Sequence, residues 1–276
     1  MQSKSQIRSI ASTSLPTSSR EPCDSPLWVS LRRTVRAIEG RHIEADAAAA
    51  LIPFGLADID AVLGGGLPRP ALHEIAATSE AAVAAATGFT LAMAKRGAEA
   101  RPVLWVAEDM ARKESGAPYG PGLDESGLSP EQVVMVAAAQ AHDVLWAMEE
   151  ALRCRAIGAV IGEIRKENAI DAVASRRLSL AAGEGATLAL LLRSRPDTRP
   201  VAAATRWIVA AQPSTPLPYA VGPPAFAVRL VRNRHGRTGS WVLEWNRAEQ
   251  RFDLASARPQ PVAQTAADRS RDAAVA

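Results

Sequence analysis

The sequence is poor in cysteine and in net charge, and both shortages narrow the kinds of protein it can encode. Its two cysteines, Cys23 and Cys154, lie far apart and form no C-x-x-C pair. This spacing argues against a zinc site or a disulfide framework and fits a reducing cytosol. The formal net charge is only +3, so any contact with nucleic acid would need a local basic patch.

Segments for export or membrane insertion are absent as well. Residues 1–25 are rich in Ser, Thr and Pro and lack the continuous apolar stretch of a signal peptide. No later run reaches the length of a membrane span. We therefore expect a cytoplasmic protein that makes no membrane contact.

Common metal and nucleophile motifs are also missing. His73 and Glu74 begin an H-E-x-x-H pattern, but Ala77 stands at the second histidine position, and the surrounding residues favour a strand rather than the helix this motif needs. No G-x-S-x-G sequence occurs. We expect no bound metal.

The 276 residues, of which 47% are hydrophobic, are enough for one large domain with irregular ends. Residues 1–24 and 256–276 are polar and without periodicity, which predicts a flexible tail at the start and a disordered tail at the end. Between them, residues 50–255 are predicted to form the folded domain.

Residues 25–45 are predicted to form a basic amphipathic helix ahead of that domain. Ser25 and Pro26 suit the N-cap and the first turn of a helix. Apolar and basic residues then separate at helical spacing onto two faces, with Leu27, Leu31, Val35 and Ile38 on one and Arg32, Arg33 and Arg36 on the other. We favour a helix packed on its own domain over an arm that binds a partner.

From residue 71 onward, short apolar runs alternate with helix-length segments, a pattern typical of parallel strands joined by right-handed crossovers. The strands are expected near 71–76, 103–107, 133–137, 157–162 and 187–192, with helices at 140–153 and 168–182. The alternating residues 241–245 predict an antiparallel hairpin with 226–232. The expected fold is α/β, with a mostly parallel central sheet flanked by helices and a C-terminal antiparallel hairpin.

A glycine-rich motif precedes the first expected core strand. Phe54-Gly55 leads through a short helical turn to Gly64-Gly65-Gly66-Leu67-Pro68, and Leu72-His73-Glu74-Ile75 follows. The glycines permit a tight loop before Pro68 turns the chain into the strand. A generic glycine-rich turn is the alternative, but the order of these residues resembles the start of a RecA-family ATPase core. That resemblance implies a RecA-like domain.

In RecA-like ATPases the first strand leads into a phosphate loop, G-x-x-x-x-G-K-[ST]. Here Ala77 and Ala82 stand at the two glycine positions, Val83 at the lysine and Ala84 at the magnesium-binding hydroxyl, while Glu80 adds negative charge. Valine offers no charge to the phosphates and alanine cannot ligate a metal. We expect little or no ATP hydrolysis, weak nucleotide binding at best and no cofactor.

Two acids of a RecA-like site are still present. Glu108 follows the strand at 103–107, where RecA-like enzymes keep a catalytic glutamate, and Glu163 occupies the Walker B position. Carboxylates at the carboxyl ends of parallel strands can hold magnesium or orient water. Without a phosphate loop we favour vestigial or structural roles over catalysis.

The densest positive segment covers residues 228–239. Arginines there can bind phosphate in a forked geometry, and polar neighbours can add neutral donors. The candidate binding residues are Arg229, Arg232, Asn233, Arg234 and Arg237. A DNA contact, a protein interface and a solvated basic hairpin all stay open at this stage.

The run Leu-Val-Arg-Asn-Arg-x-Gly-Arg-Thr-Gly at 230–239, with the G-G-G-L-P motif and the missing phosphate loop, resembles the ImuA family of bacterial mutagenesis cassettes over about residues 50–255. The resemblance implies a RecA-related protein of the SOS response to DNA damage. It also implies work in translesion synthesis and mutagenesis beside two partners: ImuB, a catalytically inactive relative of Y-family polymerases, and an error-prone polymerase. The expected role is non-catalytic partner binding, with DNA as a further candidate partner and nucleoid association after damage.

Two other functions fit a RecA-like core, namely a DNA-dependent ATPase or recombinase and a cell-division inhibitor similar to SulA. Between Glu163 and the strand at 186–192 there is little room for an additional DNA-binding loop, which favours the ImuA resemblance over RecA itself. The connection that follows, at 193–204, is short and carries Arg193, Arg195 and Arg199. RecA-like cores commonly associate edge to edge, so self-association stays open.

Overall fold

The computed structural model describes residues 50–255, except 167, 200, 218, 220 and 235. The chain divides into two units, residues 1–48 and 49–276. The predicted helix at 25–45 and the predicted tails at 1–24 and 256–276 lie outside the described residues. Across the described part of the chain, no helix is both long and apolar enough to cross a membrane.

Helices and strands are interspersed along the described chain up to β7, and after it only strands follow. The helices are α2 (Ala57–Leu63), α3 (Val83–Ala98), α4 (Asp109–Ser115), α5 (Gly120–Glu125), α6 (Ala141–Leu152) and α7 (Ala172–Gly185), with short 3₁₀ helices η1 (Glu80–Ala82) and η2 (Pro130–Gln132). The strands are β1 (Ala50–Ile52), β2 (Leu67–Arg69), β3 (Ala71–Ala77), β4 (Val103–Glu108), β5 (Val133–Ala138), β6 (Ala159–Ile164), β7 (Leu188–Arg193), β8 (Thr205–Gln212), β9 (Ala225–Asn233), β10 (Gly239–Asn246) and β11 (Arg251–Leu254).

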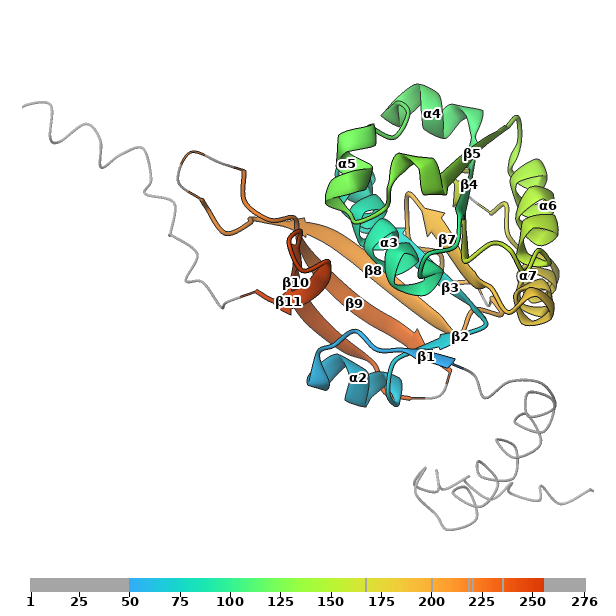
Figure 1. The fold of residues 1–276 in the computed structure, drawn as a ribbon. Coiled ribbons are helices and arrows are strands. Elements are labelled where there is room, and N and C mark those ends of the chain that lie inside the picture. The colour runs from blue at the N-terminus through green and yellow to red at the C-terminus, as the bar shows by residue number, and fades with distance from the viewer. Residues whose placement is uncertain are drawn as a thin grey trace, which may run out of the picture. The chain divides into compact units, whose positions relative to one another are not determined.

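A nine-stranded sheet forms the centre of the domain, in the order β11-β10-β9-β8-β3-β7-β6-β4-β5. The strands from β8 to β5 run parallel, and β9, β10 and β11 add to β8 in antiparallel order (Figure 1). β1 and β2 form a separate antiparallel pair. The predicted parallel sheet and C-terminal hairpin are therefore confirmed.

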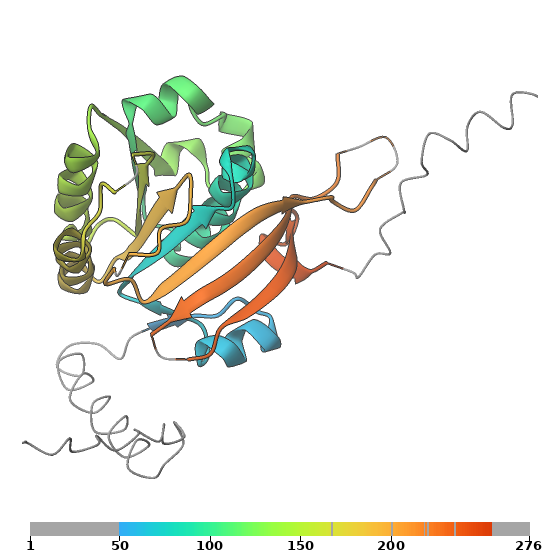
Figure 2. The ribbon, with the colours of Figure 1, turned by 180° about the vertical axis from the view of Figure 1, so that it is seen from behind.

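Helices cover the parallel part of the sheet on both faces, which explains its apolar strands. α3 packs over β8, β7 and β3, whereas α6 and α7 contact β6, β4 and β3, and Figures 1 and 2 show these helices on opposite sides of the sheet. The core on the α3 side contains an aromatic cluster. Its members are Phe54, Phe89, Trp207, Phe226, Trp245 and Phe252.

The predicted strands between residues 71 and 192 are confirmed, each within two residues. The helix expected at 168–182 begins later, at Ala172, because the side chain of Asp171 accepts a hydrogen bond from the Ala174 N–H and caps the helix there. β8 has no counterpart among the predicted strands. It lies between β3 and β9 and joins the parallel strands to the hairpin.

Strand direction separates the two groups of candidate residues. The phosphate-loop positions, Glu108 and Glu163 lie at or just beyond the carboxyl ends of parallel strands. The β9–β10 turn lies at the other end of the sheet, because Asn233 pairs with Thr205, the first residue of β8. The fold therefore does not bring the two predicted sites together.

Candidate functional site

The degenerate phosphate loop keeps the strand-loop-helix order of its functional counterpart but not its backbone. β3 leads through Thr78 and Ser79 into η1 and α3. The Thr78 N–H donates to the carbonyl of Val209 at 2.9 Å, the Ala82 N–H to Ser79 at 2.9 Å, and the Val83 N–H to Glu80. No residue from 77 to 84 has a positive φ. These donors are used within the chain and do not form the concave array of N–H groups that holds an anion.

Side chains at the loop positions are part of the hydrophobic core. Ala77, Ala82 and Val83 are buried and belong to the cluster beneath α3, whereas Ala84 is exposed. Val83, at the position of the phosphate-binding lysine, is 7% exposed. The position that would need a charged side chain reaching into solvent therefore contributes to packing.

The two remaining acids are buried on neighbouring strands and are both satisfied by the segment after β6. Oε2 of Glu108 accepts hydrogen bonds from the N–H groups of Arg165 at 2.7 Å and Lys166 at 3.2 Å. The Arg165 guanidinium donates to Oε1 of Glu163 from Nε at 3.1 Å and from Nη2 at 2.8 Å. Arg165 thus holds positive charge against the Walker B carboxylate, where a RecA-like ATPase would need magnesium.

Arg165 also connects Glu163 to the degenerate phosphate loop. Its Nη1 lies 3.7 Å from Oε2 of Glu80, and its Nη2 donates to Ser115 Oγ at 2.6 Å. Glu80 also accepts a hydrogen bond from Arg195 Nε at 3.3 Å. The sequence reasoning did not single out Arg165, although a cation two residues after the Walker B acid could have drawn attention to it. Within the described residues, no three His, Cys, Asp or Glu side chains cluster to hold a metal ion.

The glycine-rich motif stabilises the start of the core. The Asp60 carboxylate accepts hydrogen bonds from the N–H groups of Phe54 at 2.7 Å and Gly55 at 3.0 Å. Gly64 ends α2 with a φ of 79°. A Cβ at Gly66 would lie 2.7 Å from the carbonyl of Ile52, so only glycine fits there.

His73 is a buried structural residue on β3. Its Nε2–H donates to the carbonyl of Pro68 at 2.9 Å, and its Nδ1 accepts from Thr205 Oγ1 at 2.7 Å. Trp207 Nε1 donates to the same hydroxyl at 2.8 Å. Burial lowers the pKa of His73 to about 4, so the imidazole is neutral near pH 7. It joins β8 to the glycine-rich motif.

The candidate residues of the basic hairpin occupy different environments. Asn233 Nδ2 donates to the carbonyl of Val62 at 3.0 Å and to that of Arg237 at 3.3 Å. Arg232 Nη1 donates to the carbonyl of Val201 at 2.7 Å. Asn233 and Arg232 therefore hold the end of β9 against α2 and the segment before β8.

The other arginines of this group are exposed. Arg234 and Arg237 lie in the β9–β10 turn, and Arg229 lies in the middle of β9. Arg229, Arg232, Arg234 and Arg237 form no ion pair within the described residues. We call Arg234 and Arg237 the arginine turn. Unpaired guanidinium groups at the surface can bind carboxylate or phosphate.

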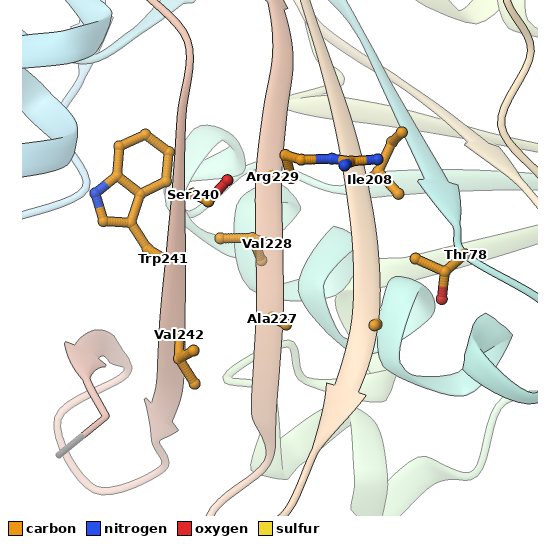
Figure 3. A pocket seen from close by; sticks show the side chains of 9 residues that line it. Thr78, Ile208, Ala227, Val228, Arg229, Ser240, Trp241 and Val242 are labelled. Atoms are coloured by element: carbon orange, nitrogen blue, oxygen red, sulfur yellow. The ribbon is translucent and has the colours of Figure 1, made fainter. Parts of the chain in front are cut away.

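A hollow of about 460 Å³ lies on the sheet beside Arg229 (Figure 3). Figure 3 shows the Arg229 side chain extending toward Ile208, with Val242 on the neighbouring strand. We call this surface the open sheet face, and it consists of Ile208, Ala210, Ala227, Arg229, Ser240 and Val242. Val242 is 40% exposed. Apolar side chains around one cation are typical of a protein-binding surface.

The edge strand β5 is a second exposed apolar feature. Val134 is 49% exposed and Met135 is 39% exposed. β5 is the last strand of the sheet and pairs only with β4. An exposed strand edge can pair with another chain.

Comparisons with known proteins give a similar sequence family and a similar fold. No protein-family model matches the chain. The chain is 32% identical over 211 residues to Protein ImuA in two strains of Caulobacter vibrioides, which covers 70% of this chain and 83% of the relative. Among solved structures it is similar to the RadB recombinase, with a TM-score of 0.50 and 14% identity over 75% of this chain and 100% of that one. The second similarity concerns the fold alone and confirms the predicted RecA-like class.

Proposed function

Because the chain belongs to the ImuA family, we propose that it is a non-catalytic, RecA-like accessory protein of SOS-induced translesion synthesis and mutagenesis. In this role it binds an ImuB-like protein and an error-prone polymerase, with DNA as a further partner. It works in the cytoplasm and joins the nucleoid after DNA damage. The fold supplies a rigid frame for these contacts and performs no chemistry.

The closed phosphate loop is the observation that carries the non-catalytic part of the proposal. A phosphoryl-transfer site works by positioning the nucleotide and stabilising charge, which requires free backbone donors, a lysine and a metal. Here the N–H groups of Thr78, Ala82 and Val83 are bonded within the chain, and the Val83 side chain is packed in the core. The Arg165 guanidinium already neutralises Glu163. Several separate changes would be needed to rebuild a nucleotide site.

ATP turnover by the full chain, with and without single-stranded DNA, tests this part. We expect no turnover above background. Turnover that Glu108→Gln abolishes and the exposed control Glu131→Gln leaves intact would overturn the proposal and favour a DNA-dependent ATPase. Equal background in all three proteins would agree with it.

The open sheet face and the arginine turn are the surfaces that support partner binding. The first offers apolar contact area around Arg229, and the second offers two unpaired cations. Arginine at the centre of an apolar patch is typical of binding hot spots. We assign the protein partners to the open sheet face and anionic contacts to the arginine turn.

Co-purification with the ImuB-like protein and the polymerase tests the assignment. Arg229→Glu should weaken co-purification at least about tenfold, whereas Arg176→Glu, an exposed arginine on α7, should not. Arg234→Glu should instead weaken binding to single-stranded DNA, with an affinity that falls steeply as salt rises. Unchanged binding in both assays would reject a role for both surfaces.

A further inference from the structure

A groove of about 470 Å³ lies between α6 and α7. The two helices pack against each other on one side of the sheet (Figures 1 and 2). Residues three and four positions apart lie on the same face of a helix, and one such face of each helix lines the groove. The lining residues are His142, Asp143, Leu145, Trp146 and Glu149 of α6 and Ala174, Arg177 and Leu178 of α7. None of them belongs to the open sheet face or to the arginine turn.

Trp146 is the most conspicuous side chain of this groove. It is 63% exposed, whereas the other tryptophans of the described residues are buried or half-buried. A single exposed apolar residue is common and needs no function. Here, however, Leu145 and the buried Leu178 line the same groove, so the ring extends an apolar surface. An exposed tryptophan beside an apolar groove is typical of a binding hot spot.

The two carboxylates that line the groove differ in their partners. Glu149 pairs with Arg153 at 2.6 Å and with Arg177 at 2.5 Å. Asp143 Oδ1 lies 2.9 Å from Nε2 of His142, and Asp143 forms no ion pair with a lysine or arginine within the described residues. Histidine is not a permanent cation. The end of the groove at Asp143 therefore lacks the positive charge that the end at Glu149 has.

These features define the chemistry of a ligand. The apolar side chains favour an apolar partner surface, and Asp143 favours a cation beside it. Trp146 follows Asp143 by three positions on the same helix face, so one cation can contact both. Arginine suits this position best because its guanidinium pairs with carboxylates and stacks on aromatic rings. A nucleic-acid strand fits poorly because the carboxylates repel phosphate.

We infer that the groove binds a basic amphipathic helix of a protein partner. A groove between two packed helices accepts the apolar face of a third helix. Its apolar side chains cover Leu145 and Leu178, and an arginine stacks on Trp146 and pairs with Asp143. The inference goes beyond the accessory role, because it adds a second protein-binding surface that does not depend on the open sheet face.

The test uses the full chain and two synthetic helical peptides of equal length with the same stripe of leucines. One peptide carries arginines on its polar face and the other carries glutamates. Fluorescence anisotropy of the labelled peptides measures both affinities. We expect the arginine peptide to bind at least about tenfold more tightly than the glutamate peptide, because only its charge complements Asp143.

Two substitutions separate the apolar contact from the charged one. Trp146→Gln should weaken binding of the arginine peptide at least about tenfold, because it removes the aromatic anchor. Asp143→Lys should weaken the arginine peptide and strengthen the glutamate peptide. The matched controls are Tyr119→Gln, which removes another exposed ring, and Glu131→Lys, which reverses another exposed charge. Neither control should change either affinity.

Asp143 also lies in the first turn of α6, where a carboxylate stabilises the helix terminus. Thermal unfolding therefore accompanies every binding measurement. If Asp143→Lys lowers the midpoint, the neutral variant Asp143→Asn decides, and it should weaken the arginine peptide alone. Equal affinities of the two peptides would overturn the inference, as would an arginine-peptide affinity that Trp146→Gln and Asp143→Asn leave unchanged.

A second copy of this chain is the competing occupant of the groove. Self-association of the full chain that Trp146→Gln abolishes would assign the groove to that copy and overturn the inference. Arg229→Glu separates the groove from the accessory role. Loss of co-purification with the ImuB-like protein in Arg229→Glu, without any effect of the groove variants on the peptides, would leave the accessory role intact and reject the groove. The converse result would support the groove and reject the open sheet face.

Discussion

Arginines at the two ends of the sheet are in opposite electrostatic situations. At the carboxyl end of the parallel strands, Arg165 pairs with Glu163, and Arg195 pairs with Glu80. At the β9–β10 turn, Arg234 is exposed and forms no ion pair within the described residues. A paired arginine has its counter-charge inside the protein, whereas an unpaired one can bind an external anion. We therefore expect the arginines at the carboxyl end of the parallel strands to contribute mainly to stability, and those at the β9–β10 turn to bind partners.

Arg193 is the exception at the carboxyl end, because its Nη1 lacks a partner although the residue is buried. The comparison therefore does not rest on exposure alone.

The largest loss of stability is expected from removing Arg165. Arg165→Ala leaves the buried Glu163 without its cation, and we expect the free energy of unfolding to fall by about 3 kcal/mol because breaking a buried pair leaves an uncompensated charge. Urea denaturation at neutral pH measures the change. Adding Glu163→Gln should recover part of the loss, and a loss no larger than that of Arg237→Ala would contradict the assignment.

A pH titration tests the buried hydrogen bonds that link His73, Thr205 and Trp207. The pKa of His73 is lowered from 6.5 to about 4 by burial, so between these values the unfolded chain binds a proton that the folded chain does not. The stability from neutral His73 is fully present above about pH 6.5 and is lost as the pH falls toward 4, about 3 kcal/mol in all. The free energy of unfolding, measured by urea denaturation at several pH values in this range, should fall more steeply with decreasing pH than that of His73→Gln. Equal slopes would show that His73 is not buried in its neutral form.

Restoring the lysine of the phosphate loop tests how firmly the loop is closed. Val83→Lys places a cation at a position that is 7% exposed, and we expect a loss of about 2 kcal/mol without any gain in ATP binding. Thermal unfolding and nucleotide titration provide the two measurements. Ala84→Thr, at an exposed position, is the matched control. ATP binding gained at unchanged stability would mean that the loop lacks only its lysine.

The smallest effect on stability is expected at the arginine turn. Arg237→Gln removes a charge that has no partner among the described residues, so the free energy of unfolding should change by less than about 0.5 kcal/mol. Its effect should appear in binding to anionic partners. A destabilisation comparable with that of Arg165→Ala would remove the distinction between the two ends.

Much of the fold could be predicted because its pattern is local. Apolar runs such as 103–106 and the alternation at 241–245 depend on neighbouring residues, and both became strands. β8 escaped prediction because it combines Arg206 with apolar residues. Arg206 is tolerated in the sheet only because Glu74, 132 residues earlier, lies beside it.

Part of the candidate site could also be predicted from the sequence. The loss of the phosphate loop follows from Ala77, Ala82, Val83 and Ala84 as residue types. The part played by Arg165 does not, since it depends on Glu80 and Glu163 lying around one guanidinium. Asn233 was a candidate ligand by type, but its amide is bonded to Val62 and Arg237.

The sequence by itself determined the alternation of strands and helices, the ImuA resemblance and the missing phosphate-loop chemistry. Only the tertiary structure decided which arginines have acceptors. Periodicity and residue type act over a few positions, whereas the order β8-β3-β7-β6 brings distant charges into contact. The environment of Arg193 and the freedom of the arginine turn are therefore properties of the folded chain.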